Sequence, residues 1–357
     1  MRAYEHGLSS RRVFLHGAAA AASAAVVGCA AADTEGDLYP RARSEGQLDL
    51  YGGGPTAAFT NWARQYEAAF PGLKVNIVSA FSNELSPRID AQIAAGKVEA
   101  DVAILQTLQD FDRWTRQGEL LGFEPDGLRE IPPLFRDPAG TSFPLGVVAV
   151  AYAYNPDRLA RDAVPRVATD FLKPEFRDQI ISTYPHDDDL TLFLYDAIVR
   201  KYGWSFVDGL MANKPRFIRG HLGVVREIAA GRSAVTFDAT FSQSAAAAAQ
   251  GAKIALAIPD DPMPIFAQSA GVFRRAPHPN AAKLFVTWLL GKDQQSRLGP
   301  GRWSPRRDVP PPAGLRPITD YPILTGFREF VLDEPRLRDL RRQFEAKIGP
   351  IQGDPVL

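Results

Sequence analysis

The 357-residue sequence contains a single cysteine, Cys29, and only five histidines. One cysteine cannot form a disulfide within the chain, and no C-x-x-C metal or redox motif is present. Two histidines precede Cys29, so that His186, His221 and His278 alone follow it. Zinc sites usually combine several Cys, His and carboxylate ligands. The sequence therefore argues against a zinc enzyme, and we expect no metal and no cofactor.

An excess of positive charge is also absent, because 41 Lys and Arg residues balance 41 Asp and Glu residues. A nucleic-acid-binding surface needs a basic excess that releases counterions from the phosphate backbone. The balance therefore argues against a nucleic-acid partner. With 45% hydrophobic and 23% charged residues the composition is that of a soluble globular protein, and the length favours two domains.

The apolar run at residues 13–28 is too short to span a membrane, which needs roughly 20 apolar residues. It follows Arg11 and Arg12, as in a twin-arginine export signal, and it ends in Val-Val-Gly-Cys, which resembles a lipoprotein lipobox. We expect residues 1–28 to be a signal peptide, Cys29 to carry the lipid that anchors the protein to the membrane, and residues 29–44 to be a tether. A chance arginine pair, cleavage near residues 30–32 and a permanent anchor helix are the alternatives.

From residue 45 the apolar pattern alternates between the periods of strands and helices. It predicts strands at 48–51, 75–80 and 101–105, separated by helices at 59–70 and 87–95, the second capped by Ser86. Strands separated by such helices form parallel sheets with right-handed crossovers, and ligands gather at the carboxyl ends of the strands. The loops that follow the strands are therefore the candidate binding segments.

A second unit begins at residues 147–156, a long alternating stretch that we interpret as a crossover strand. Further strands are predicted at 180–183, 217–218, 234–238 and 253–259, with helices at 188–202, 222–230 and 242–251. The chain then continues with predicted helices at 280–290, 322–332 and 335–348. No repeat of fixed period is visible.

Several strings, in this order and spacing, resemble the solute-binding proteins of ABC importers, especially the binders of ferric iron, thiamine and phosphonates. They are EGQLDLYGGG, AAFPGLKV, SNEL, AADVAIL, YNPDRL and APHPNAAKLFVTWLL. The resemblance implies an α/β fold of the two-lobed periplasmic-binding-protein type (class II), in which each lobe is a mixed sheet flanked by helices and two crossover strands join the lobes. It implies lobe 1 at 45–146 plus about 260–320, lobe 2 at 147–259, and C-terminal helices at 321–357.

The same resemblance implies an exported monomer, in the periplasm or at the cell surface, that is not an enzyme. Such a protein closes on a small polar solute by a hinge motion and delivers it to an ABC permease with its ATPase. A tethered sensor with the same fold is an alternative. An exported enzyme is a further one, but the sequence has no G-x-S-x-G elbow, no H-E-x-x-H and no dinucleotide fingerprint.

Candidate ligand-binding residues lie in the loops after the strands. They are Gly53, Gly54, Ser82, Asn83, Glu84, Gln106, His186, Asp187, Asp238, Thr240, Ser269 and Trp303. Glycines at a helix start can face an anion, whereas the polar side chains can bind solute or cap the next helix. Trp303 is either a stacking surface or a core anchor. We also hypothesise that Glu84 and Asp238 meet across the closed cleft.

One departure from the resemblance concerns iron. Iron-binding relatives coordinate ferric iron with two adjacent tyrosines after the strand that here reads AVTFD, but this chain has Ala239 and Thr240 there. The glutamate of those relatives corresponds to Glu84, and their first-loop histidine corresponds to Pro55. Free ferric iron is therefore doubtful as the ligand. An iron chelate, a phosphonate or organophosphate, or an organic acid or amine remain open.

Overall fold

A computed structural model describes residues 34–356 of the chain. The arginine pair, the apolar run and Cys29 lie outside the described residues, so the predicted export signal and lipid anchor stay predictions. Among residues 34–356 no helix has the length and apolar character needed to cross a membrane.

Twelve α-helices are present in the described part of the chain. They are α1 (Glu35–Glu45), α2 (Thr56–Ala69), α3 (Ser82–Ala94), α4 (Leu108–Arg116), α5 (Asp189–Tyr202), α6 (Ser205–Ala212), α7 (His221–Ala229), α8 (Phe241–Ala249), α9 (Pro279–Leu290), α10 (Lys292–Gln295), α11 (Phe327–Leu332) and α12 (Glu334–Ile348). The strands are β1 (Gln47–Gly53), β2 (Lys74–Ala80), β3 (Val102–Leu105), β4 (Ser142–Tyr154), β5 (Ile181–Thr183), β6 (Arg216–Ile218), β7 (Val235–Thr240), β8 (Ala255–Ala257), β9 (Met263–Val272) and β10 (Ile323–Leu324).

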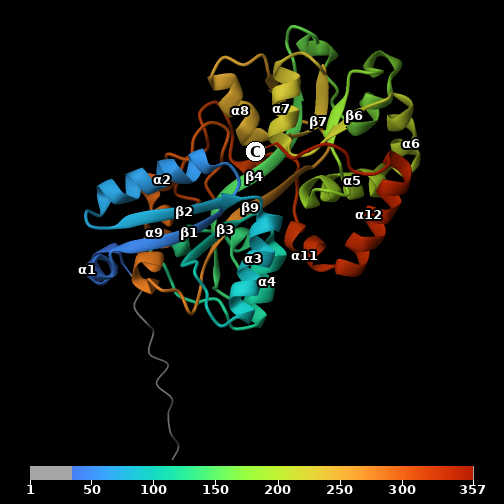
Figure 1. Ribbon diagram of the computed structural model, residues 1–357. Coiled ribbons are helices and arrows are strands. Elements are labelled where there is room, and N and C mark those ends of the chain that lie inside the picture. The colour runs from blue at the N-terminus through green and yellow to red at the C-terminus, as the bar shows by residue number, and fades with distance from the viewer. Residues whose placement is uncertain (1–33, 357) are drawn as a thin grey trace, which may run out of the picture. The chain divides into compact units, whose positions relative to one another are not determined.

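The main sheet has the strand order β2-β1-β3-β9-β4-β7. β1 is parallel to both β2 and β3, as predicted, whereas β9 is antiparallel to β3 and β4. The long strand β4 pairs with β9 over its first part and with β7 and β8 over its second part. β4 and β9 therefore run side by side through the middle of the described chain and connect its two halves (Figure 1).

We call the half built on β1, β2 and β3 lobe 1. Successive residues of its strands face opposite sides of the sheet, which is the period of a β-strand. Leu50 and Ile104 belong to the core under α1, α2 and α9, whereas Tyr51 and Leu105 belong to the core under α3 and α4. Lobe 1 is thus a sheet covered by helices on both faces, which fits the short apolar strands predicted from the sequence.

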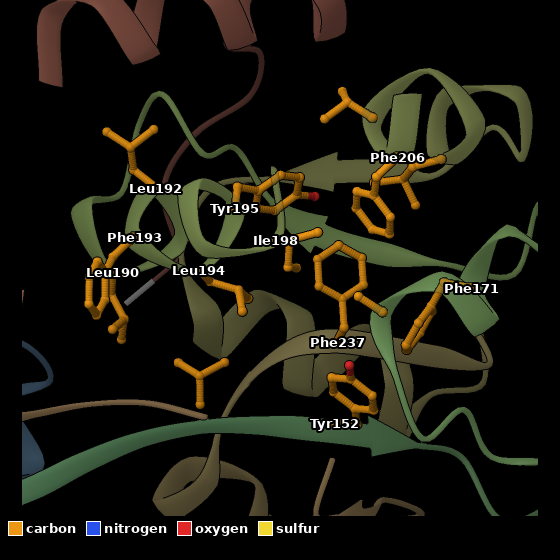
Figure 2. Packing of buried hydrophobic residues seen from close by; sticks show 14 of the residues in the cluster. Tyr152, Phe171, Leu190, Leu192, Phe193, Leu194, Tyr195, Ile198, Phe206 and Phe237 are labelled. Carbon is orange, nitrogen blue, oxygen red and sulfur yellow. The ribbon is translucent and has the colours of Figure 1, made fainter. Parts of the chain in front are cut away.

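We call the half built on β5 to β8 lobe 2, and its largest core is rich in aromatic residues. Phe237 of β7 lies between the rings of Phe171 and Tyr195, with ring centroids 5.1 and 5.3 Å away (Figure 2). Phe330 of α11 and Phe344 of α12 belong to the same core. The C-terminal helices therefore pack on lobe 2, and β5 and β6 form a small parallel sheet beside it.

The structure corrects the expected tether at residues 29–44, because residues 35–45 form helix α1. Thr34 caps this helix by accepting a hydrogen bond from the Asp37 N–H, and Gly46 ends it in the left-handed conformation. Leu38 and Ala42, one turn apart, are fully buried and face α9. Two apolar residues in a small, charged segment are too weak a pattern to predict a helix, and only the surface of α9 makes them a packing face.

Two predicted boundaries are also wrong. The second helix starts at Ser82 rather than at residue 87, so that Pro87 lies inside α3. Because Asn83 is exposed, water can bond the carbonyl that Pro87 leaves without a donor. The helix expected at 322–332 begins only at Phe327, since residues 323–324 form β10 against β9. The strand β9 and the helix α4 are absent from the pattern-based prediction.

Candidate functional site

The carboxyl ends of β1 and β3 in lobe 1 bring four predicted site residues together. A Cβ atom on Gly53 would lie 2.2 Å from Ser82 Oγ, so only glycine fits at the end of β1. Ser82 Oγ in turn accepts a hydrogen bond from the Gln106 backbone N–H at 3.1 Å. Gly54, with a φ of +129°, turns the chain towards α2. These residues form one edge, at the place where parallel sheets bind ligands.

Strands β9 and β4 extend this edge towards lobe 2. Ser269 of β9 lies opposite Leu105 of β3, and Gln268 lies opposite Gly146 of β4. Ser269 is buried, and its hydroxyl donates to the Ala267 carbonyl at 3.2 Å. Ser269 is therefore held by its own strand, whereas the neighbouring Gln268 reaches the loop that follows α10 through Arg302.

Asn83 and Glu84 are exposed in the first turn of α3, not in a loop as predicted. In lobe 2, the Asp187 carboxylate accepts two hydrogen bonds from Arg219, at 2.8 and 3.1 Å. The hydrogen bond from Arg219 to Asp187, followed by the charges of Asp187, Asp354 and Glu84, raises the pKa of the Arg219 guanidinium. The charge of Glu84 in lobe 1 therefore lies within electrostatic reach of Arg219 in lobe 2.

His186 lies in the loop between β5 and α5 and is 9% exposed. Neither of its ring nitrogens has a well-aligned hydrogen-bond partner among residues 34–356, although the Gly349 backbone lies close enough to favour the protonated ring. Its ring packs edge-on against Tyr184, with centroids 5.4 Å apart, and burial lowers the pKa of His186. The imidazole is thus neutral near pH 7, and it is one of the few buried polar side chains in the described chain that have unused donor or acceptor atoms.

Asp238, near the end of β7, is fully buried at the centre of a polar network in lobe 2. The hydroxyls of Ser182 and Thr183 donate to its Oδ2 atom at 3.0 and 2.7 Å, and the Thr183 N–H donates to the same atom at 2.9 Å. His221 Nε2 lies 3.1 Å from Oδ1. The carboxylate is surrounded by groups of its own lobe, so its role here is to join β5, β7 and α7.

The charges in this network stabilise each other. Burial disfavours the charged form of His221, but the carboxylates of Asp238 and Asp188 outweigh it and raise the pKa of His221 to about 9. Burial likewise disfavours ionised Asp238, but the charge of His221 and the hydrogen bonds of His221 and Thr183 lower the pKa of Asp238. The two groups therefore form a buried ion pair at neutral pH.

This ion pair predicts a pH dependence of stability. The pKa of His221 is about 6.5 when unfolded and about 9 when folded, so the contribution of about 3 kcal/mol is complete below pH 6.5. It falls as the pH rises from 6.5 to 9 and is absent above. Urea unfolding at several pH values should show this loss in the wild type. The His221→Asn variant should lack it, and an equal slope in both proteins would contradict the assignment.

The last two predicted site residues have partners inside the protein. The Thr240 hydroxyl donates to Gln243 Oε1 at 2.8 Å in the first turn of α8. Trp303 is 2% exposed, packs on Phe241 with ring centroids 4.8 Å apart, and donates its indole N–H to the Arg316 carbonyl at 2.9 Å. Of the two roles left open for Trp303, this geometry is that of a core anchor.

Sequence reasoning missed two arginines that bond candidate or neighbouring residues, Arg219 with Asp187 and Arg302 with Gln268. Arg219 follows the short strand β6, so its position after a strand is a usable signal. Arg302 lies in an irregular loop with no recognisable pattern, and only the tertiary structure brings it to β4 and β9.

A group of possible metal ligands, Asp49, Asp101 and His278, lies at the amino ends of β1 and β3. Asp101 accepts hydrogen bonds from the backbone N–H groups of Asp49 and His278, at 2.7 and 2.6 Å, and lies 2.8 Å from His278 Nδ1. Its oxygens thus tie the start of α9 to the sheet, and we assign the group a structural role.

Neither prominent cavity is lined by the predicted site residues. One, of about 320 Å³, lies in lobe 2 between α5 and the start of β9, lined by residues such as Tyr152, Ile198 and Met263. The other, of about 230 Å³, lies between α7 and the C-terminal segment that contains Asp354 and Val356. The candidate site is therefore the edge where the two lobes meet β4 and β9, not a preformed cavity.

Comparisons with known proteins agree with this architecture. Residues 52–296 match the family described as bacterial extracellular solute-binding protein. A substrate-binding protein of an ABC transporter from Agrobacterium tumefaciens has a TM-score of 0.72 at 15% identity and covers 85% of this chain and 94% of its own. Iron-bound HitA from Pseudomonas aeruginosa has a TM-score of 0.68 at 17% identity, covering 84% and 99%.

AfuA from Actinobacillus pleuropneumoniae, with fructose-6-phosphate bound, has a TM-score of 0.68 at 18% identity and covers 85% of this chain and 98% of its own. At such identities the likeness shows the fold. The predicted two-lobed α/β fold and the resemblance to ABC solute-binding proteins are confirmed, and the similar proteins are binding proteins rather than enzymes.

Proposed function

Because the chain belongs to the family of bacterial extracellular solute-binding proteins, we propose that it captures a small polar solute between its lobes and delivers it to an ABC permease. The proposal includes export by the twin-arginine route and a lipid on Cys29 that keeps the protein near its permease. The folded protein then waits at the membrane, and solute binding favours the closed form that the permease recognises.

The observation that carries the proposal is the pair of long strands β4 and β9. They pair with each other from Ser142 to Ala149 of β4. β9 also pairs with β3 of lobe 1, and β4 also pairs with β7 and β8 of lobe 2. A register shift between Pro144 and Gly146 interrupts the ladder close to the candidate site. Such an irregularity bends a strand locally, so small changes of backbone angle there can move one lobe against the other.

The polar side chains at this edge favour a polar solute. Gln106 is exposed beside the glycine turn of lobe 1, and Glu84 is exposed within electrostatic reach of Arg219 of lobe 2. An apolar solute would leave such groups without partners, which costs free energy. An iron chelate, a phosphorylated compound or an organic acid are the solute classes that we propose, since the similar structures include proteins with bound iron and with a bound sugar phosphate.

Native mass spectrometry of the protein purified gently from its own cell envelope tests this function. We expect a co-purifying small-molecule mass that disappears on denaturation, and a rise in Tm when the solute is returned to stripped protein. A chain without any bound mass, and without a thermal shift from pooled metabolites, would contradict solute capture and favour the sensor or enzyme alternatives.

Glu84 provides a more local test. The Glu84→Gln variant should bind the recovered solute several-fold more weakly or more tightly, because it removes a charge that acts on Arg219 of the other lobe. Glu67→Gln is a matched control, since Glu67 lies in α2 and bonds Lys74 and Val75 within lobe 1. Equal affinity in wild type and Glu84→Gln would remove Glu84 from the site.

A further inference from the structure

Arg302 lies against the two strands that connect the lobes. A Cβ atom on Gly146 of β4 would lie 2.5 Å from Arg302 Nε and 3.1 Å from its Cζ atom, so the absence of a side chain at Gly146 makes room for the guanidinium. Arg302 Nη2 donates to Gln268 Oε1 of β9. The positive charge therefore sits on both connecting strands at once.

This guanidinium has no counter-charge within residues 34–356. No carboxylate of the described chain lies within salt-bridge distance of it, and Nε is buried without any hydrogen-bond partner. Burial lowers the pKa of Arg302 to about 10. By contrast, Arg306 and Arg307 of the same loop pair with Asp308 and Glu130. The Arg302 side chain is partly buried and stays charged near pH 7, and a charge that has lost part of its hydration without gaining a partner is costly.

The sheet register places Arg302 in line with the candidate site. Leu105 of β3 lies opposite Ser269 of β9, so Gln106 comes next to Gln268. Gly54 in turn lies close to the Gln106 amide, since a Cβ atom on Gly54 would be 4.0 Å from Gln106 Nε2. Gly54, Gln106, Gln268 and Arg302 therefore form a row along the carboxyl edge of the parallel strands.

The loop of Arg302 also reaches lobe 2. A Cβ atom on Gly301 would lie 2.6 Å from Ala245 Cβ and 2.8 Å from Phe241 Cδ1, so the loop packs closely on the first turns of α8. Thr240 is the residue before α8, and its hydroxyl donates a hydrogen bond to Gln243 instead of capping the helix. The amino end of α8 adds its partial positive charge to the same region.

We propose that Arg302 is the counter-charge for an oxyanion of the solute, a carboxylate or a phosphate, bound along the row Gly54–Gln106–Gln268–Arg302. This inference rests on the proposed function and adds the charge of the solute and the residues that bind it. Nη2 of the guanidinium bonds Gln268 and Nε is enclosed against Gly146, so Nη1 is the donor left for the anion, and Gln268 Nε2, which bonds no described residue, can donate beside it. Because Arg302 touches both connecting strands, the anion binds at the point where the lobes move.

The test uses mature protein stripped of solute by unfolding and refolding. Inorganic phosphate and citrate are titrated into it by calorimetry at matched ionic strength. We expect at least one of the two anions to bind saturably at one site per chain. Which anion binds shows whether the site prefers phosphate or carboxylate. Arg302→Gln should weaken this binding about tenfold or more, and Arg302→Lys should weaken it less.

Two further variants distinguish a binding role from a structural one. Gly146→Ala keeps the charge but moves the guanidinium, and it should also weaken anion binding. Arg307→Gln removes a positive charge from the same loop, where Arg307 pairs with Glu130, and it should bind the anion like the wild type. Without anion, Arg302→Gln should not have a lower Tm than the wild type, because an unpaired buried charge has been removed.

Anion affinity equal to the wild type in both Arg302→Gln and Gly146→Ala would overturn the inference, as would a lower Tm of solute-free Arg302→Gln at unchanged affinity. If neither anion binds, the chemical class of the solute found by native mass spectrometry tests the inference. A solute without carboxylate or phosphate would overturn the inference but leave the proposed function standing. A solute with such a group would be titrated into the same variants with the same criteria. The absence of any solute would overturn both.

Discussion

Asp238→Ala is expected to lower the free energy of unfolding by about 3–5 kcal/mol, because it removes the nearer carboxylate from buried His221 and leaves only that of Asp188, at 3.7 Å. The hydroxyl of Thr183 and the N–H of the same residue would also lose their acceptor. The variant would therefore weaken the packing of β5, β7 and α7 against each other. Urea unfolding followed by circular dichroism measures it.

Asp260→Ala is the matched control in lobe 2. Asp260 forms an exposed ion pair with Arg166 at 2.9 Å, and exposed pairs contribute about 1 kcal/mol or less. Equal losses in the two variants would contradict the role of the network. If Asp238→Ala lost solute binding while keeping full stability, the earlier hypothesis that Asp238 meets Glu84 across the cleft would return.

Trp303→Ala is expected to lower the free energy of unfolding by about 3–5 kcal/mol, the usual cost of removing a large buried aromatic side chain. Trp303 is 2% exposed, contacts Phe241 and Tyr321, and its backbone carbonyl accepts a hydrogen bond from Val147 of β4 at 2.9 Å. Trp303→Phe should retain most of the stability, because it keeps much of the aromatic volume. Denaturant unfolding of both variants gives the comparison.

Trp62→Ala is a suitable control for this prediction. Trp62 of α2 is only partly buried, so its replacement should lower the free energy of unfolding by less. Nearly unchanged stability of Trp303→Ala, together with weaker solute binding, would instead assign Trp303 to the binding surface. A core anchor thus predicts a loss of stability in Trp303→Ala, whereas a stacking surface predicts a loss of solute affinity.

The order of strands and helices could be predicted from the sequence because apolar period is a local property. The strands at 75–80 and 101–105 correspond to β2 and β3, and the helix at 188–202 corresponds to α5, which Asp188 caps and Gly203 follows. The family could be predicted for a related reason, since its short strings keep their order along the chain. Both kinds of signal survive without any long-range contact.

Site chemistry depended more on the fold. Gly53, Ser82 and Gln106 were predicted from their place after strands, and the structure brings them together at one edge. Asp238 was selected by the same rule, yet β5 and α7 fold over it and use its carboxylate internally. Whether a polar residue after a strand faces solute or its own lobe depends on neighbours that are distant in sequence.

The sequence by itself determined the class of protein and the alternation of its elements, because both are carried by local patterns of apolar, polar and glycine residues. Only the tertiary structure decided that residues 35–45 are a helix, that Trp303 is enclosed, and that Arg302 lies beside β4 and β9 with no carboxylate partner among the described residues. The physical reason is that burial and charge pairing are properties of packed surfaces. Gly146, Gln268 and Arg302 are far apart along the chain. The antiparallel pairing of β4 with β9 and the bridge between Val147 and Trp303 make them neighbours.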